Sequence, residues 1–309
     1  MGPTRSLENA MARLGTSEEP GRDRHAYAGE HITGLLLDSI VHPSDFSQAS
    51  EVAFAHALKL TCLTEAELSI LHVASEVTDR HWMDFPRVRI TLARWGILPE
   101  GCPREAVGKA GLRVQKIQAP GTDPVRTMLH YLADYPADLL VLATHQRTGL
   151  ARWFHKAVAV PITRRAKTMT LFVPHGVAGF ISLDDGAVTL KRILIPIDTV
   201  SHPQAAVDVA AGLAQVLGCH EVAFTLMYVG AMGDMPAVHE PRHTGWSWDR
   251  VVRHGSVAEQ ILEVETACAA DLVVLTTRRQ YGVLDALRVS ILAGVLRRAQ
   301  CPVLALPVG

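Results

Sequence analysis

DLLVLATHQRTG at residues 138–149 and DLVVLTTRRQYG at residues 271–282 are two copies of one segment, and they decide the fold. In each copy an aspartate precedes a short apolar run, LLVLA in the first and LVVLT in the second. A strand has this composition when both of its faces are buried, as in a parallel sheet covered by helices. The segment therefore predicts one buried parallel strand in each half of the chain.

The repeat extends in both directions from this segment. RRAKTMTLFVP at 164–174 falls on RRAQCPVLALP at 297–307, and SIVHPSDFSQAS falls on RILIPIDTVSHP with Asp45 opposite Asp198. The chain therefore consists of two homologous halves. We predict four parts, which are a mobile N-terminal tail (1–32), a first domain (33–175), a linker rich in Gly and Asp (176–189) and a second domain (190–309).

Each half alternates short apolar runs with segments of helical periodicity. This alternation predicts two doubly wound α/β domains, each with an open parallel sheet, and it places ligands beyond the carboxyl ends of the strands. The expected helices are 47–60, 124–135, 153–166, 203–217, 256–269 and 286–299. The expected strands are Ser39–His42, Ala66–Val73, Leu112–Gln118, Asp138–Ala143, Thr170–Val173, Arg192–Ile197, Glu221–Val229, Asp249–Arg253, Asp271–Thr276 and Pro302–Leu306.

Composition excludes several classes of protein. The 309 residues contain 30 Lys and Arg against 31 Asp and Glu, so no charge excess favours nucleic acid or an anionic membrane. No apolar run approaches the roughly 20 residues of a membrane helix, and the N-terminus lacks the apolar region of a signal peptide. The five cysteines have no CxxC spacing and are predicted to be free buried thiols. We expect a cytoplasmic protein.

With the repeat in view, both halves resemble the universal stress protein (UspA) family. The residues that carry the resemblance are HPSDFSQAS (42–50), SILHVAS (69–75), DLLVLATHQRTGLAR (138–152) and AQCPVLALPV (299–308). The resemblance implies a Rossmann-like fold of the adenine nucleotide α-hydrolase type, in tandem. It also implies that the last strands, Thr170–Val173 and Val303–Leu306, pair antiparallel as an internal pseudo-dimer, which would remove two sheet edges. A further homodimer is compatible with it.

ATP-binding members of this family carry G-x2-G-x9-G-[ST] after the fourth strand. Glycines let backbone N–H groups approach phosphate oxygens, and the hydroxyl adds a donor. None of the six glycine positions of the two halves holds a glycine, and only one hydroxyl survives. The matching residues are Ala143, Gln146, Lys156 and Ala157 in the first half, and Thr276, Arg279, Val289 and Ser290 in the second. The resemblance therefore implies a degenerate ATP site in both domains.

Other nucleotide-site residues of the family persist in this chain. Asp45 and Asp198 match the acidic residue beside the nucleoside, although an aspartate after a strand also serves to cap the next helix. Val73 and Val229 match the position whose backbone meets the base. In the second half, Arg278 and Arg279 bring two guanidinium groups suited to phosphate, and Ser290 keeps a donor. ATP in the second domain is thus the alternative to a chain without any cofactor.

The segment before the third strand of the second half is short. We predict that it is a loop holding His239, His243, Trp246 and Trp248 in place of a helix. HEPRH at 239–243 has the i, i+4 histidine spacing of a metal site, but Pro241 favours a loop and we predict no metal. The aromatic segment GWSW (245–248) is interpreted as cover for the shortened packing, with a partner surface or a lid as alternatives.

The sequence leaves two hypotheses of function. The first is a stress-response regulator that is not an enzyme and acts by binding a protein partner or a small ligand. The second is an adenine-nucleotide sensor or slow ATPase that uses Asp198, Arg278, Arg279 and Ser290. No motif names a catalytic nucleophile or a pair of catalytic carboxylates.

Overall fold

The structure is a computed structural model of the chain, and it describes residues 35–74, 84–144, 168–278 and 291–308. The predicted tail (1–32) and the predicted helix at 153–166 lie outside these residues. Of the predicted helix at 286–299, residues 291–296 are described and helical.

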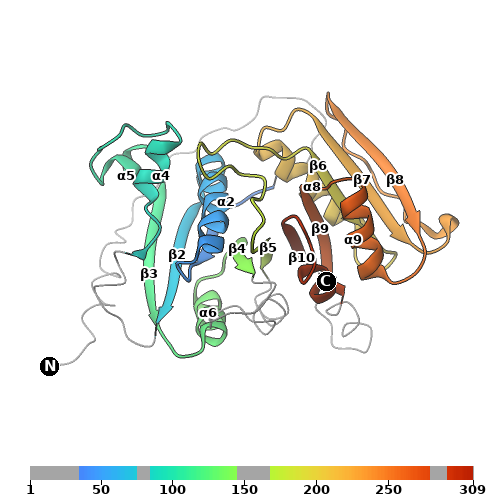
Figure 1. The fold of residues 1–309 in the computed structure, drawn as a ribbon, viewed down its shortest axis with the longest axis horizontal. Helices are drawn as coiled ribbons and strands as arrows, with labels where there is room; N and C mark the ends of the chain where they lie inside the picture. The colour runs from blue at the N-terminus through green and yellow to red at the C-terminus, as the bar shows by residue number, and fades with distance from the viewer. Residues whose placement is uncertain (1–34, 75–83, 145–167, 279–290, 309) are drawn as a thin grey trace, which may run out of the picture. The chain divides into compact units, whose positions relative to one another are not determined.

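In the first half all five predicted strands are confirmed, each to within two residues at either end (Figure 1). The predicted helices at 47–60 and 124–135 are confirmed as well, and two short helices lie between the second and third strands. The elements are β1 (Ser39–Pro43), α2 (Gln48–Thr64), β2 (Glu67–Ala74), α4 (Val88–Arg94), α5 (Ala106–Lys109), β3 (Arg113–Pro120), α6 (Pro124–Asp134), β4 (Leu139–Thr144) and β5 (Met169–Pro174).

The second half repeats this order with one change before its third strand. A short 3-10 helix and an irregular segment replace the helices there, and the third strand begins at Trp246. The prediction that Trp246 and Trp248 belong to a loop was therefore wrong, because both lie in the strand. The elements are β6 (Arg192–Pro196), α8 (Pro203–Val216), β7 (Val222–Val229), η1 (Met232–Asp234), β8 (Trp246–Arg253), α9 (Val257–Ala267), β9 (Leu272–Arg278) and β10 (Val303–Val308).

The ten strands form one sheet in the order β3-β2-β1-β4-β5-β10-β9-β6-β7-β8. Within each half the strands are parallel, and the chain reverses its direction of winding between β1 and β4 and again between β6 and β9. These are the two switch points of a doubly wound sheet, and a ligand is expected at the carboxyl ends of their strands. The predicted fold class is confirmed.

The two halves meet where β5 pairs antiparallel with β10. The register places Phe172 opposite Val303, Leu171 opposite Leu304 and Thr170 opposite Ala305. All of these side chains are buried. The predicted pairing of the last strands is therefore confirmed. Because β5 and β10 pair with each other, neither of them is an exposed edge strand.

The aspartate at the head of the repeated segment has the same role in both halves. The Oδ2 atom of Asp138 accepts from the N–H groups of Asp38 and Ser39, each at 2.9 Å. The Oδ2 atom of Asp271 accepts from those of Lys191 and Arg192 at the same distance. The carboxylate thus binds the start of the first strand of each half and fixes its position beside the fourth.

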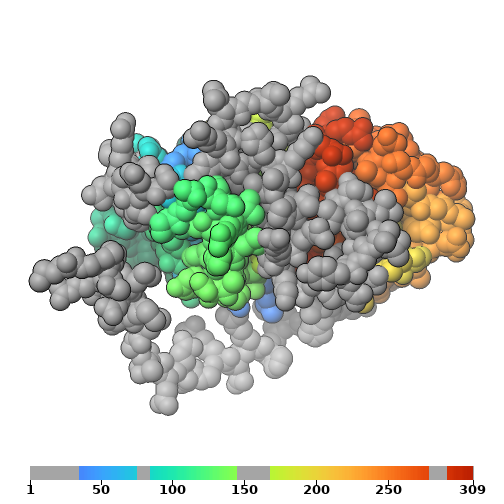
Figure 2. All heavy atoms as spheres, turned by 90° about the horizontal axis from the view of Figure 1, so that it is seen from below, coloured from blue at the N-terminus to red at the C-terminus, as the bar shows by residue number. Residues whose placement is uncertain are grey.

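Two apolar cores lie on the two faces of the sheet. One contains buried residues of α2 and α8, and the other contains buried residues of α6, α9 and the helical residues 291–296. Adjacent residues Ile40 and Val41 of β1 belong to different cores, as alternation along a strand requires. Helix α6 buries only Met128 and Leu132, and its other side reaches the surface (green in Figure 2).

The predicted linker is packed against the first half. Phe180 and Ile181 are buried, and both donate their N–H groups to Nε2 of His56 on α2, at 3.0 and 3.3 Å. Further along, the Trp95 indole N–H donates to the carbonyl of Leu183. The composition of this segment predicted a connection, and the structure adds that the connection is part of the core.

Among the helices of the described residues, none is both long enough and apolar enough to cross a bilayer.

Candidate functional site

The second-half switch point contains a pocket of about 60 Å³ at the carboxyl ends of β6 and β9. Two predicted site residues, Asp198 and Thr276, lie in its wall together with the start of α9. This volume admits a few water molecules. The lining residues are Pro196, Ile197, Asp198, Val257, Ile261, Leu275, Thr276, Thr277, Ile291 and Leu292.

Of the other predicted site residues of the second half, two end strands and three lie outside the described residues. Val229 is the last residue of β7 and is not among the pocket's lining residues, and Arg278 is the last residue of β9. Arg279, Val289 and Ser290 lie outside the described residues. The structure therefore brings Asp198 and Thr276 together at one opening.

Asp198 binds its own loop. Its Oδ1 atom accepts from the N–H groups of Val200 and Ser201 at 2.7 and 2.6 Å, and its Oδ2 atom accepts from the Ser201 hydroxyl at 2.8 Å. Helix α8 begins after His202, which makes no side-chain capping bond. The carboxylate thus shapes the turn between β6 and α8 at the mouth of the pocket.

Asp45 has a similar role in the first half. Its Oδ1 atom accepts from the N–H and the hydroxyl of Ser47, at 3.0 and 2.6 Å. Ser47 in turn caps α2 by accepting from the N–H of Ser50 at 3.2 Å. The helix cap is therefore Ser47, and Asp45 holds the capping residue in position.

Aromatic side chains pack together after the first strand of the first half, on the face of the sheet opposite to the side chain of Val73, the residue that matches the base-contact position. Phe46 follows Asp45 with a φ of 62° and stacks on His72, with ring centroids 4.0 Å apart. It meets the buried Phe85 edge-on at 5.3 Å, and His72 Nδ1 lies 2.8 Å from the carbonyl of Ser44.

A buried histidine joins the two strands at the first-half switch point. His42 on β1 is fully buried, and its Nδ1 lies 2.9 Å from the carbonyl of Val141 on β4. Its Nε2 lies 3.3 Å from the Ser50 hydroxyl. Burial lowers the pKa of His42 to about 4, so the ring is neutral at pH 7 and bridges the two strands without a charge. Sequence reasoning did not single out His42.

The histidine pair of HEPRH lies on irregular backbone, as Pro241 predicted. Gln204 on α8 binds the N–H and the carbonyl of His239 at 2.7 and 3.0 Å, and Glu240 pairs with Arg250 at 2.8 Å. Within the described residues no three His, Cys, Asp or Glu side chains gather closely enough to hold a metal ion.

The two tryptophans of β8 cover the face left open by the shortened segment. Trp248 stacks on Phe224 of β7 at 4.1 Å with nearly parallel rings, and Trp246 meets the same ring edge-on at 5.1 Å. Their indole N–H groups donate to the carbonyls of Pro241 and Cys219. Both side chains pack against the core under α8, in agreement with the interpretation as cover for the lost helix.

The amino-acid sequence matches a known protein-family model. The sequence model described as "Universal stress protein family" matches residues 37–174 and 237–307, which together exceed half of the chain. None of the curated proteins matches the sequence.

Solved structures share the fold over most of the chain. A universal stress protein from Archaeoglobus fulgidus DSM 4304 is 17% identical with a TM-score of 0.56, covering 90% of this chain and 99% of its own. A putative universal stress protein from Pseudomonas aeruginosa UCBPP-PA14 is 12% identical with a TM-score of 0.58, covering 89% and 94%. A functionally unknown protein from P. aeruginosa PAO1 gives 12% and 0.59 with the same coverage.

Proposed function

Because the chain belongs to the universal stress protein family, we propose that it is a stress-response regulator that acts by binding a protein or a small ligand and not by catalysis. The observation that carries this proposal is the replacement of all six glycines of the family's ATP-binding pattern, because without them neither half keeps the backbone that approaches phosphate oxygens. We place the protein in the cytoplasm, because its five cysteines, all of them free, suit a reducing compartment.

The first half would serve as a scaffold. Displacing Phe46 exposes its ring and that of the buried Phe85, and each exposed aromatic side chain costs on the order of 2 kcal/mol. His42 and its bond to Val141 further hold β1 against β4. Gln146 and Lys156 stand where ATP-binding members of the family have glycines. A scaffold that binds no phosphate does not need the backbone freedom of glycine at these positions, so the replacements agree with this role.

In this proposal the second half binds the ligand. Its pocket lies at the switch point, and both polar and apolar groups line it, among them Asp198, Thr276 and Ile261. A pocket of about 60 Å³ suits a small ligand or the tip of a partner's side chain in preference to a whole nucleotide.

Calorimetric titration of nucleotide-free protein with ATP and magnesium tests the proposal. We expect no heat of binding up to millimolar ATP, and no change when Arg279 is replaced by Ala. Lys156→Ala, at a family glycine position of the first half, is the matched control. Micromolar binding at one site would refute a regulator without nucleotide.

The same titration tests the second candidate, an adenine-nucleotide sensor or slow ATPase. The observation that favours it is the position of Asp198 and Thr276 in one pocket at the switch point. In that case ATP would bind with a stoichiometry of one, and Arg279→Ala would abolish binding, since a guanidinium supplies the phosphate contacts that glycines supply elsewhere in the family. Lys156→Ala would leave this binding unchanged.

A further inference from the structure

The sheet ends in the second half with an edge strand, β8, whose backbone has an open side. This strand lies at the end of the strand order and pairs with β7 in a continuous register without a bulge (Figure 1). The N–H groups of Val222 and Gly230 donate to the carbonyls of Gly245 and Arg253. The odd-numbered residues of β8 therefore turn their backbone groups toward β7, and the even-numbered residues turn theirs away from the sheet.

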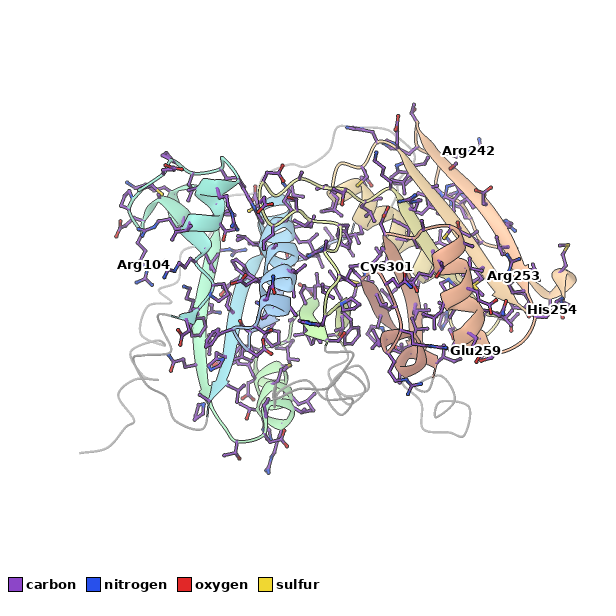
Figure 3. The ribbon with its side chains drawn as sticks, in the orientation of Figure 1. Arg104, Arg242, Arg253, His254, Glu259 and Cys301 are labelled. Atoms are coloured by element: carbon purple, nitrogen blue, oxygen red, sulfur yellow. The ribbon has the colours of Figure 1, made fainter. Side chains whose placement is uncertain are left out.

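The outward backbone groups are available in the central part of β8. Among the residues that the structure describes, no partner bonds the N–H or the C=O of Arg250 or the N–H of Val252. The Val252 carbonyl accepts from the guanidinium of Arg253 at 3.1 Å, and this side chain is exposed. Figure 3 shows Arg253 near the end of β8. An edge strand with unpaired donors and acceptors is a template for pairing with a further strand.

The charged side chains of β8 are placed symmetrically about Val251. Asp249 lies two residues before it and Arg253 two residues after it, so all three project from the same face of the strand. Asp249 and Arg253 are exposed, and neither forms an ion pair with any residue that the structure describes. Arg250 projects from the opposite face and is already paired with Glu240 at 2.8 Å. The strand thus presents one unpaired negative and one unpaired positive charge on one face.

This arrangement is complementary to itself. When two copies of β8 pair antiparallel with Val251 opposite Val251, each Asp249 lies opposite Arg253 of the second copy. Arg250 then lies opposite Val252, and these two residues exchange backbone hydrogen bonds through their outward groups. The half-buried Val251 side chains meet at the centre and lose contact with water. Centring the pairing on Arg250 instead would leave both charges unpaired, so the charges select the register.

The other edge strand of the sheet lacks this complementarity. β3 carries Arg113 and Lys116 and no acidic residue, so two copies of it would bring like charges together. It also ends at Pro120, which has no N–H group to donate. Of the two edges, β8 is therefore the one suited to a second copy of the chain.

We propose that two copies of this chain associate through β8, antiparallel about Val251, and so join their sheets into one. The contact of a single pair of strands is small, so the dimer is weak and dissociates in the micromolar range. None of the β8 residues lines the pocket of the second half, and the pairing does not depend on the function proposed above.

Disulfide cross-linking of the full chain tests the register. In the proposed pairing the two Val251 residues form a pair without hydrogen bonds, with Cα atoms about 4.5 Å apart, which a disulfide can bridge. Val251→Cys should therefore form a covalent dimer in oxidised glutathione, seen on a non-reducing gel. Val252→Cys is the matched control, because each Val252 lies opposite Arg250, and it should remain a monomer as the wild type does. Equal cross-linking of the two variants would overturn the proposal.

Sedimentation equilibrium tests the charge pairs. Asp249→Arg places like charges opposite each other and should weaken dimerisation about tenfold, and adding Arg253→Asp should restore it, because the pair is then reversed. Asp134→Arg, at an exposed position on α6, should dimerise as the wild type does. Asp249 is exposed, so its replacement should leave the fold intact. A wild-type chain that stays monomeric at several hundred micromolar, or an Asp249→Arg variant that dimerises as tightly as the wild type, would show that β8 does not bind a second copy.

Discussion

Buried His56 makes the packing of the linker sensitive to pH. Its Nδ1 lies 2.8 Å from the carbonyl of Val52, and its Nε2 accepts from the N–H groups of Phe180 and Ile181. These bonds require a neutral ring with the proton on Nδ1, because a protonated Nε2 could not accept. Burial lowers the His56 pKa from its ordinary value of 6.5 to about 4, as it does for His42.

The sign of the effect follows from proton binding. Between pH 6.5 and pH 4 the unfolded chain binds protons that the folded chain does not, so stability is complete above pH 6.5 and is lost as the pH falls toward 4. For one such histidine the linkage relation gives a loss of roughly 2 kcal/mol between pH 7 and pH 5. With His42 and His56 together, the wild type should lose about 4 kcal/mol over this interval.

Urea unfolding of the wild type and of His56→Gln at pH 7 and pH 5 measures this loss. The variant should be less stable at pH 7, since it loses the fit of the ring against Phe180, but its further loss on acidification should fall to about 2 kcal/mol. His130→Gln, at an exposed position on α6, should retain the wild-type loss. If His56→Gln and the wild type show the same difference between the two pH values, the assignment of His56 as a neutral acceptor is wrong.

Three further predictions concern packing. Gly179 has a φ of 73° and a side chain there would overlap the His56 ring, so Gly179→Ala should cost about 2–4 kcal/mol in urea unfolding, and Gly176→Ala, which meets no neighbour, only about 1 kcal/mol. Trp248→Ala should cost about 3–5 kcal/mol because the stacked face of Phe224 is uncovered, and an unchanged urea midpoint would contradict that role. A chain cut to residues 1–189 keeps the linker on α2 but leaves β5 as an open edge and should self-associate in light scattering, whereas a stable monomer would show that the β5–β10 pairing is dispensable.

Periodicity and the internal repeat predicted the strands well, because the central strands of each half are apolar runs bounded by turn residues. The runs at 139–144 and 272–278 and the pairing of β5 with β10 were confirmed to within a few residues. Trp246 and Trp248 were assigned wrongly to a loop, because the histidines and the proline that precede them are typical of loops. Both tryptophans lie in β8, and their side chains cover the core where a helix was expected to be missing.

The candidate site was predictable only in part. Asp198 and Thr276 were expected near one ligand and do line one pocket. The aromatic cluster of the first half could not be read from single residues, because Phe46, His72 and Phe85 come from three separate segments that meet only in the fold. For the same reason the linker's attachment to His56 was invisible, since it joins residues more than 120 positions apart.

One difference between the halves connects these observations. The second residue before the switch-point aspartates is Pro43 in one half and Pro196 in the other, but the residue preceding it is His42 in the first half and Ile195 in the second. His42 binds the carbonyl of Val141 across the switch point, which ties β1 to β4. Ile195 has no polar group to make such a bond, and the second half has a pocket at its switch point. The polar bridge within the sheet is therefore a feature of the first half, and Ile195 leaves the corresponding position of the second half without it.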